Sequence, residues 1–552
     1  MIEVEVHQQL RALLREQVTP HWPHHLTMAR LVARALRLGR SALIQTGTEA
    51  GLSAPYRLSY LMPLLLWEGP AIVVATASLQ EWLMTVELPR LQQWLDAPKP
   101  VQKIPSISSK SEISPAIQGF SGISLVTPQD WFRDRIAQRG QFPANILTII
   151  DGVDDLDAWL QEVLSLQIHP IHWDQLMLSH PNFRSVIRDL RISLTHTLFQ
   201  HPANPYNCYV LEPEEDYRPI HHCLAQLQRS SPLPPIWAAF YQALGRSIDL
   251  ETDRRERDQR SERGTETQTD PGLLSAKLDR QSGTFILQHR PIRFAPLLQP
   301  IWQTQPTVLI GSALDLEASA DIYRQTHGLQ DLTCLKFSPP RHEACIQLYQ
   351  PDRMPMPNTP QFQPALLAEL RHILARSPLT SGLGVILVED TPLRHQVGAQ
   401  LAAEWGTRVQ VDRLPDGNQG ILVTGWAEWQ QLQMIPAGRE GGGGGLVPRC
   451  LVIATLPMPS LEDPIVAARV RDYKRLRQDW FRLYLLPRAL MALQRAVFPV
   501  RSTRGLVALL DSRVLHRNYG QQVLTALSPY ARVNYLDDNW DDDGDWETTT
   551  AP

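Results

Sequence analysis

Two parts of the chain alternate short apolar runs with helical segments, and this alternation constrains the fold more than any other feature. In the first part the apolar runs are SALIQTG, AIVVATA, ISLVTP and ILTIID. In the second part, which begins near residue 360, they are GVILVED, GILVTG, CLVIATLP and GLVALLD. Apolar strands that alternate with helices favour parallel sheets covered by helices on both faces. The sequence therefore predicts an α/β protein with two lobes.

The stretch between these two parts has a different composition. It is rich in Leu, His, Trp and Pro at helical spacing, then charged and poor in apolar residues, before the strand-like run TVLIGSAL. Helical spacing predicts a helical insertion, and the charged stretch is typical of a linker. The predicted division is 1–155 for the first part of lobe 1, 156–245 for the helical insertion, 246–285 for the charged linker, 286–320 for the return to lobe 1, 321–535 for lobe 2 and 536–552 for an acidic disordered tail.

The charge balance does not exclude a nucleic-acid partner. The 552 residues carry 53 Lys and Arg against 57 Asp and Glu, a formal charge of −4. Seven of the acidic residues lie in the last sixteen positions, so the rest of the chain is mildly basic. The basic residues are almost all Arg, because the chain has six Lys and the first is Lys99.

Composition also bears on the compartment. The five Cys form no CxxC pair, which argues against a disulfide framework or a zinc ribbon. The most apolar stretch, 58–77, is interrupted by Pro63, Glu68 and Pro70, so no membrane span is predicted. The N-terminal segment is amphipathic and polar and lacks the pattern of a secretory signal. We therefore expect a cytoplasmic protein.

Residues 41–66 have the strand–loop–helix layout of a phosphate-binding loop. A glycine-containing turn before a helix exposes backbone N–H groups at the positive end of the helix dipole, which suits a phosphate. The pattern GxxxxGK[ST] is not met: counted from Gly47, Leu52 and Ser53 stand where it requires Gly and Lys. Two interpretations stay open, a structural turn or a degenerate nucleotide loop made of Gly47, Thr48, Gly51 and Ser53.

Asp151 ends the apolar run ILTIID. A carboxylate at that position is where nucleotide-cleaving sheets hold Mg²⁺. Asp also ends strands as a turn former, so the metal role and the structural role both stay open.

The order and content of these segments resemble the DinG/XPD-like helicases of superfamily 2. LVIATLPMPSLEDPIVAARV (451–470) and the stretch 481–520 resemble the C-terminal part of that family, and AIVVATASLQEWL (71–83) resembles its motif Ia. The resemblance implies two RecA-like lobes, with a helical arch as the insertion in the first lobe. It implies ATP with Mg²⁺ as cofactor and single-stranded or branched DNA as partner. The implied nucleic-acid contacts are Thr76, Gln80 and Thr127.

The motifs that would act on ATP depart from the family pattern. Motif I has no Lys, and motif II, DEAH in the family, reads DGVD with only Asp151 kept. Motif VI runs from Gln494 to Arg501, with Phe498 in place of one phosphate-facing arginine. Loss of an arginine finger alone costs about 10³–10⁵ in rate. Asp151, Gln494 and Arg501 are therefore expected to be vestigial catalytic residues, and Mg²⁺ at Asp151 is doubtful.

An iron–sulfur cluster is not expected. Many such helicases carry four cluster-binding Cys between motifs Ia and II, where this chain has none between Leu83 and Asp151.

Three functions stay open at this point. The first is a degenerate helicase that binds nucleic acid or a protein partner, with ATP hydrolysis weak or absent. The second is a residual ATP-dependent DNA helicase of the repair or replication class, and the third is a protein–protein scaffold. Whether the chain is an enzyme is therefore left open.

Overall fold

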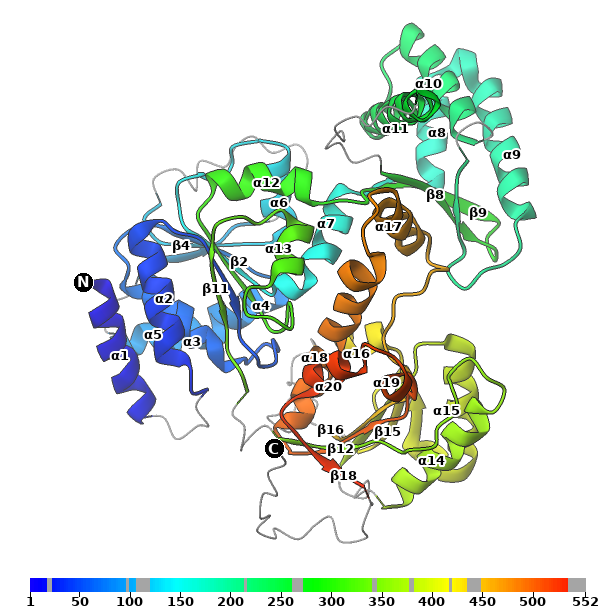
Figure 1. Cartoon of the computed structure of the whole chain (residues 1–552). Coiled ribbons are helices and arrows are strands. Elements are labelled where there is room, and N and C mark those ends of the chain that lie inside the picture. The colour runs from blue at the N-terminus through cyan, green and yellow to red at the C-terminus, as the bar shows by residue number, and fades with distance from the viewer. Residues whose placement is uncertain are drawn as a thin grey trace.

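The computed structural model describes residues 1–16, 22–95, 99–105, 120–212, 216–260, 272–339, 345–376, 382–415, 419–433 and 448–534, with the backbone alone for 250–260. In these ranges the chain forms two seven-stranded sheets and one four-stranded sheet. Figure 1 shows three bodies, namely lobe 1, lobe 2 and an insertion that stands beside both.

Lobe 1 is built on an all-parallel sheet of order β11-β1-β10-β5-β2-β4-β3. Its strands are β1 (Ala42–Gln45), β2 (Ala71–Val74), β3 (Val101–Lys103), β4 (Ile123–Val126), β5 (Thr148–Asp151), β10 (Thr307–Gly311) and β11 (Thr333–Lys336). Its helices are α1 (Ile2–Glu16), α2 (His25–Leu38), α3 (Leu58–Leu66), α4 (Ala77–Trp82), α5 (Leu88–Leu95), α6 (Pro128–Ile136), α7 (Leu156–Leu164), α12 (Ala295–Thr304) and α13 (Asp321–His327).

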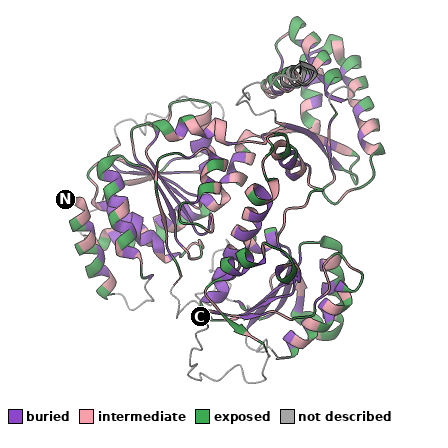
Figure 2. Ribbon diagram, viewed as in Figure 1, coloured by how far each residue is buried: buried purple, intermediate pink, exposed green. Residues whose placement is uncertain are grey.

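Burial explains why these runs form a central sheet. Every residue of β1, β2, β4, β5 and β10 is buried, as expected for strands covered on both faces (Figure 2). One apolar core joins the sheet to α1, α2 and α3, and a second core joins the opposite face to α6, α7 and α12.

Two predicted boundaries of lobe 1 are wrong. The lobe does not end at residue 320, because Tyr323 of α13 packs in its core and β11 pairs with β1. It also keeps α7, whose Trp159 and Leu160 lie in the same core, so the insertion does not begin at residue 156. β11 lacked a sequence signal because it is a half-exposed edge strand with the short sequence TCLK.

The insertion is mixed rather than mainly helical. Its antiparallel sheet has the order β6-β9-β8-β7, with strands β6 (Leu166–Ile168), β7 (Cys208–Val210), β8 (Leu273–Asp279) and β9 (Thr284–Arg290). Its helices are α8 (Pro170–Ser179), α9 (Arg184–Gln200), α10 (Arg218–Ser230) and α11 (Pro235–Arg260). The predicted linker over 246–285 is thus wrong where α11, β8 and β9 occupy it, while 261–271 lie outside the described residues. The apolar residues of β8 and β9 line the core of the insertion.

Lobe 2 repeats the architecture of lobe 1 with a parallel sheet of order β14-β15-β13-β16-β17-β12-β18. Its strands are β12 (Ile346–Tyr349), β13 (Leu383–Leu387), β14 (Val409–Val411), β15 (Gly420–Thr424), β16 (Pro448–Ile453), β17 (Leu506–Leu509) and β18 (Tyr530–Val533). Its helices are α14 (Phe362–Arg376), α15 (Thr391–Trp405), α16 (Trp426–Gln433), α17 (Pro464–Arg475), α18 (Leu486–Arg501), α19 (Arg513–His516) and α20 (Gly520–Leu527).

The predicted fold class is confirmed, since two large parallel sheets are flanked by helices. Helices α17 and α18, orange in Figure 1, run from the insertion down between the two lobes. Among the described residues, no helix is long and apolar enough to span a bilayer. The predicted acidic tail, 536–552, lies outside the described residues.

A candidate nucleotide site filled by an arginine

The candidate site lies where the carboxyl ends of β1 and β5 meet one edge of the sheet of lobe 1. The loop that follows β1 spans residues 46–54 and leads through the short helix η1 (Pro55–Arg57) into α3. Asp151 is the last residue of β5. Because the strands are parallel, the loop and the carboxylate emerge at the same edge, which is where ligands bind in open α/β sheets.

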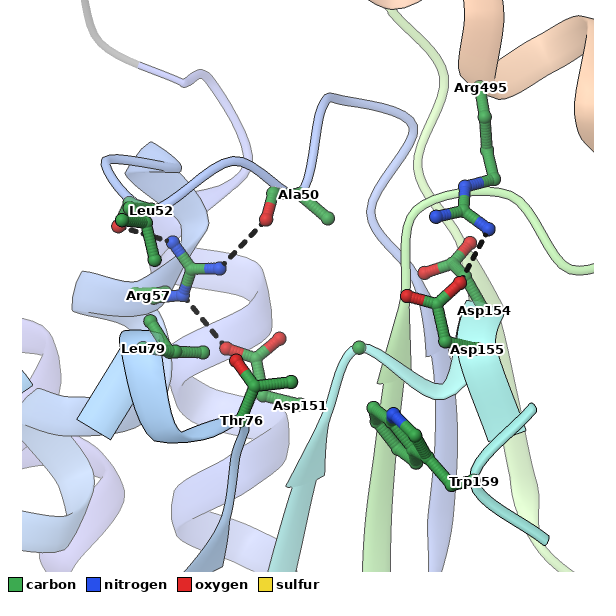
Figure 3. A pocket seen from close by; sticks show the side chains of 11 residues that line it. Ala50, Leu52, Arg57, Thr76, Leu79, Asp151, Asp154, Asp155, Trp159 and Arg495 are labelled. Atoms are coloured by element: carbon green, nitrogen blue, oxygen red, sulfur yellow. Dashed lines mark hydrogen bonds and ion pairs between the residues drawn. The ribbon is translucent and has the colours of Figure 1, made fainter. Parts of the chain in front are cut away.

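Arg57 occupies the space between this loop and Asp151. Its Nε donates to Asp151 Oδ2 at 2.8 Å. Its Nη1 donates to the carbonyls of Gly51 at 2.5 Å and Leu52 at 2.7 Å, and its Nη2 donates to the carbonyl of Ala50 at 3.1 Å. Figure 3 shows the guanidinium held between the loop and the carboxylate. The loop is therefore folded around a cation that belongs to the chain.

Two tyrosines complete the surroundings of Asp151. The Tyr56 hydroxyl donates to Oδ1 at 2.7 Å and the Tyr60 hydroxyl donates to Oδ2 at 2.9 Å. Both carboxylate oxygens thus have donors from the protein. The side chains of Arg57 and Asp151 are 3% and 0% exposed, so the pair is shielded from water.

The electrostatics keep this cluster in one protonation pattern. Burial raises the pKa of Tyr56 and of Tyr60 well above the usual value, so both hydroxyls keep the protons that they donate. Although burial opposes it, the carboxylate of Asp151 favours the charged form of Arg57 and helps to raise its pKa. The cation and the carboxylate therefore neutralise each other inside the lobe.

The residues present do not fit a nucleotide with Mg²⁺. A phosphate-binding loop offers backbone N–H groups to an anion, whereas here the carbonyls of residues 50–52 point inward to Arg57. Asp151 has both oxygens engaged, which leaves it poorly placed to take a metal ion. The free space beside Asp151 is about 20 Å³, enough for about one water. Within the described ranges, no group of three or more His, Cys, Asp and Glu residues is arranged to hold a metal ion.

The residues predicted to form a nucleotide loop have structural roles or are exposed in the turn after β1. Gly47 has φ +64°, and a Cβ there would collide with the backbone carbonyl of Phe337, so only glycine fits. Its N–H donates to the Ser312 carbonyl at 3.1 Å. Thr48 is half-buried with its carbonyl accepting from Thr46 Oγ1, and Ser53 is exposed. Gly51 contributes the carbonyl that Arg57 binds.

Two residues predicted from the resemblance to motif VI, Gln494 and Arg501, bind backbone carbonyls of lobe 2. The guanidinium of Arg501, predicted to be vestigial, donates to the carbonyls of Leu527, Ser528 and Pro529 at the end of α20 and just after it. The Gln494 amide donates to the Leu490 carbonyl within its own helix. Lobe 2 extends Arg495 toward the site, where it lies against Asp154 and Asp155 (Figure 3).

The three residues predicted to contact nucleic acid differ in how accessible their side chains are. Thr76 is half-buried at the start of α4 and lines the small space beside Asp151. Thr127 caps α6 through the backbone N–H of Asp130. Gln80 is fully buried and donates to the Ala75 carbonyl, so its side chain is inaccessible to nucleic acid and that prediction is wrong.

Sequence reasoning missed Arg57, although a signal was present. In a register that avoids the extra loop residues, Tyr56 takes the place of the absent Lys, and Arg57 is the next residue. The spacing of Tyr56, Arg57 and Tyr60 brings all three to Asp151 once the chain turns helical at residue 55.

The fold defines a class, the α/β proteins with two lobes that are each built on a seven-stranded parallel sheet. Residues 446–530 match the family model of the helicase C-terminal domain. An apo XPD structure superposes with a TM-score of 0.57 at 12% identity and covers 92% of this chain and 100% of its own. An XPD helicase structure gives 0.56 at 12% identity and covers 94% and 100%. No curated protein sequence matches the chain.

These findings place the chain structurally. At 12% identity the likeness shows the fold, and the family model matches the C-terminal part of lobe 2. The chain therefore has the fold of the XPD structures, and its residues 446–530 are similar to a helicase C-terminal domain.

Proposed function

We propose that this chain is a helicase-like protein in which ATP hydrolysis is weak or absent and which binds nucleic acid or a protein partner. The observation that carries the proposal is the ion pair of Arg57 with Asp151. It places a resident cation among the loop carbonyls where a nucleotide loop would hold phosphates. An ATP molecule would have to displace a buried, fully hydrogen-bonded pair before it could bind.

The size of the missing contributions supports weak or absent turnover. An arginine finger alone is worth about 10³–10⁵ in rate, and Arg501 is turned away to α20. The loop has no Lys, and the carboxylate that would activate water is absent from DGVD. Such effects are not additive, but each one alone removes most of the turnover.

A basic surface on lobe 2 supports the nucleic-acid role. Arg471, Lys474, Arg477 and Arg482 are exposed at the end of α17 and in the segment that follows. The Lys474 ammonium lies 5.3 Å from the ring centroid of the half-buried Trp480. Basic side chains with an interleaved aromatic ring are the features that bind single strands, through phosphates and base stacking.

The decisive test of catalysis is an ATPase assay on the full chain with and without single-stranded DNA. We expect a rate well below about 1 s⁻¹, the lower end of the common enzyme range. Asp151→Asn is the control, because it keeps an acceptor for Tyr56 and removes the metal-binding charge. A rate near 1 s⁻¹ or above that Asp151→Asn abolishes would instead support the residual helicase.

Binding is tested by titrating labelled single-stranded DNA at several salt concentrations. We expect affinity that falls with salt, because phosphate contacts release counterions. Replacing Arg471, Lys474, Arg477 and Arg482 by Gln should lower the slope of log K against log salt by up to about 3, at about 0.7 per contact.

The matched control for this titration replaces the exposed Arg11, Arg30, Arg34 and Arg40 of lobe 1, which changes the net charge equally. An equal loss in both variants would assign the effect to net charge. Salt-independent binding, or none, would favour the protein scaffold.

A further inference from the structure

Acidic residues just after β5 face arginines of lobe 2. Asp155 precedes α7 and Asp157 lies in its first turn, in the segment where the family carries motif II. Arg495 Nη1 donates to Asp155 Oδ1 at 2.8 Å, and Arg469 Nη1 donates to Asp157 Oδ2 at 3.0 Å. Arg488 also forms an ion pair with Asp157. Two carboxylates of lobe 1 thus hold three arginines of α17 and α18.

A further ion pair repeats this arrangement with the charges exchanged. Arg293 of lobe 1 binds Asp472 of α17 through both its Nε and its Nη2, the latter at 2.7 Å. Because the two planar groups meet side by side, the contact fixes orientation as well as distance. The Arg469 guanidinium also lies 5.1 Å from the ring centroid of Phe294 in the lobe 1 core.

Apolar contacts accompany these pairs. Met491 of α18 packs against the core of lobe 1, and Leu316 of lobe 1 packs against the core of lobe 2. The space that remains between the lobes near Asp157 and Arg488 is about 50 Å³, room for a few waters.

Three of the five side chains in these ion pairs are largely shielded from solvent. The side chains of Asp157, Arg469 and Arg495 are 15%, 9% and 14% exposed. Although desolvation opposes it, the carboxylates of Asp155 and Asp154 raise the pKa of Arg495. Buried pairs are screened by salt much less than exposed ones.

Asp154 ties the acidic segment to its own lobe. It accepts hydrogen bonds from Ser312 N at 2.7 Å, Ser312 Oγ at 2.7 Å and Ala313 N at 3.0 Å. The arginines of lobe 2 therefore bind a segment that is itself hydrogen-bonded to the residues after β10. These contacts connect lobe 2 to the central sheet of lobe 1.

We propose that Asp155 and Asp157, with Arg469, Arg488 and Arg495, form an interlobe latch that holds the two lobes in one arrangement without nucleotide. Superfamily 2 motors close their lobes on ATP, with phosphate between the two sets of motifs. Here carboxylates of lobe 1 meet the arginines of lobe 2 directly, so closure needs no ligand. This proposal rests on the proposed function, since a latched pair of lobes suits a protein that does not cycle with ATP.

The test measures the distance between the lobes by double electron–electron resonance. Spin labels go on Cys introduced at the exposed Gln9 of α1 and Gln400 of α15. The partly accessible Cys334 and Cys345 are replaced by Ser, and Cys208, Cys223 and Cys450 are buried. We expect one narrow distance distribution that millimolar ATP with Mg²⁺ leaves unchanged.

Asp155→Asn combined with Asp157→Asn should broaden that distribution. The matched control is Asp189→Asn with Asp321→Asn, which also removes two carboxylates. Asp189 pairs within the insertion and Asp321 pairs within lobe 1, so this variant should leave the distribution unchanged. A charge exchange covers the case in which the first variant misfolds: Asp155→Arg and Arg495→Asp should each broaden the distribution, and together they should restore the single peak.

Two outcomes would overturn the latch, a distribution in the wild-type protein that shifts with ATP, and an Asp155→Asn/Asp157→Asn variant that keeps the wild-type peak. ATP hydrolysis at an unchanged interlobe distance would instead overturn the proposed function and leave the latch in place.

Discussion

At the scale of single residues, the unusual feature is the source of the positive charge held by the loop that follows β1. The loop has no Lys, and Arg57 brings a guanidinium to the loop from the start of the following helix. The sequence predicted Asp151 at the end of its strand correctly, because an apolar run followed by Asp is a local pattern. The partners of Asp151 were not predictable from spacing. Arg57 is 94 positions away in the sequence, and the two residues meet only because of the way the loop after β1 folds.

The Arg57–Asp151 pair makes a prediction about stability. Arg57→Met leaves a buried carboxylate without its cation, which should cost about 3–5 kcal/mol in the local stability of lobe 1. Asp151→Asn leaves Arg57 buried and should also destabilise the lobe. The double variant should be less destabilised than the sum of the two, by about 0.5–3 kcal/mol, because each charge was the partner of the other.

Native-state hydrogen exchange of the β1 and β5 amides measures this local stability directly. The ion pair of Arg371 with Glu404 is the control: it is exposed at the surface of lobe 2, so Arg371→Met should cost no more than about 1 kcal/mol. Additive effects at Arg57 and Asp151 would show that the two side chains do not act as a pair.

At the scale of elements, α18 shows why a motif alignment alone does not tell which arginine faces lobe 1. Residues seven apart lie on the same face of a helix, so Arg488 and Arg495 both face lobe 1. Arg501 is six residues beyond Arg495 and points elsewhere, to the carbonyls that follow α20. An alignment preserves the order of residues, whereas the face on which a side chain lies depends on the helix phase.

The strands that the sequence predicted also differ from those that it missed in how strong their local pattern is. The fully buried strands were predicted because their apolar runs are continuous, as in β5 and β13. The sheet of the insertion was missed because β8 directly follows a charged stretch. The charged stretch and β8 were interpreted together as one linker. β6 and β7 have three residues each, too few for a periodic pattern.

At the scale of the whole molecule, the three candidate functions differ in which ligand stabilises the folded chain. A ligand that binds only the folded state adds about 2.7 kcal/mol at a concentration of 100 Kd. For a unit of 150–250 residues, which is about the size of one lobe, this corresponds to a Tm increase of roughly 5–10 °C. We expect such a shift with single-stranded DNA and none with ATP and Mg²⁺, because Arg57 already fills the loop.

Thermal unfolding of the full chain with each ligand separately measures both shifts in one experiment. A shift with ATP that Asp151→Asn removes would indicate a residual nucleotide site and contradict the proposed function. No shift with either ligand would leave the protein scaffold as the best account of the fold. A shift with DNA alone is the expected result, because Arg471, Lys474, Arg477 and Arg482 are exposed in the same arrangement in which Arg495 pairs with Asp155.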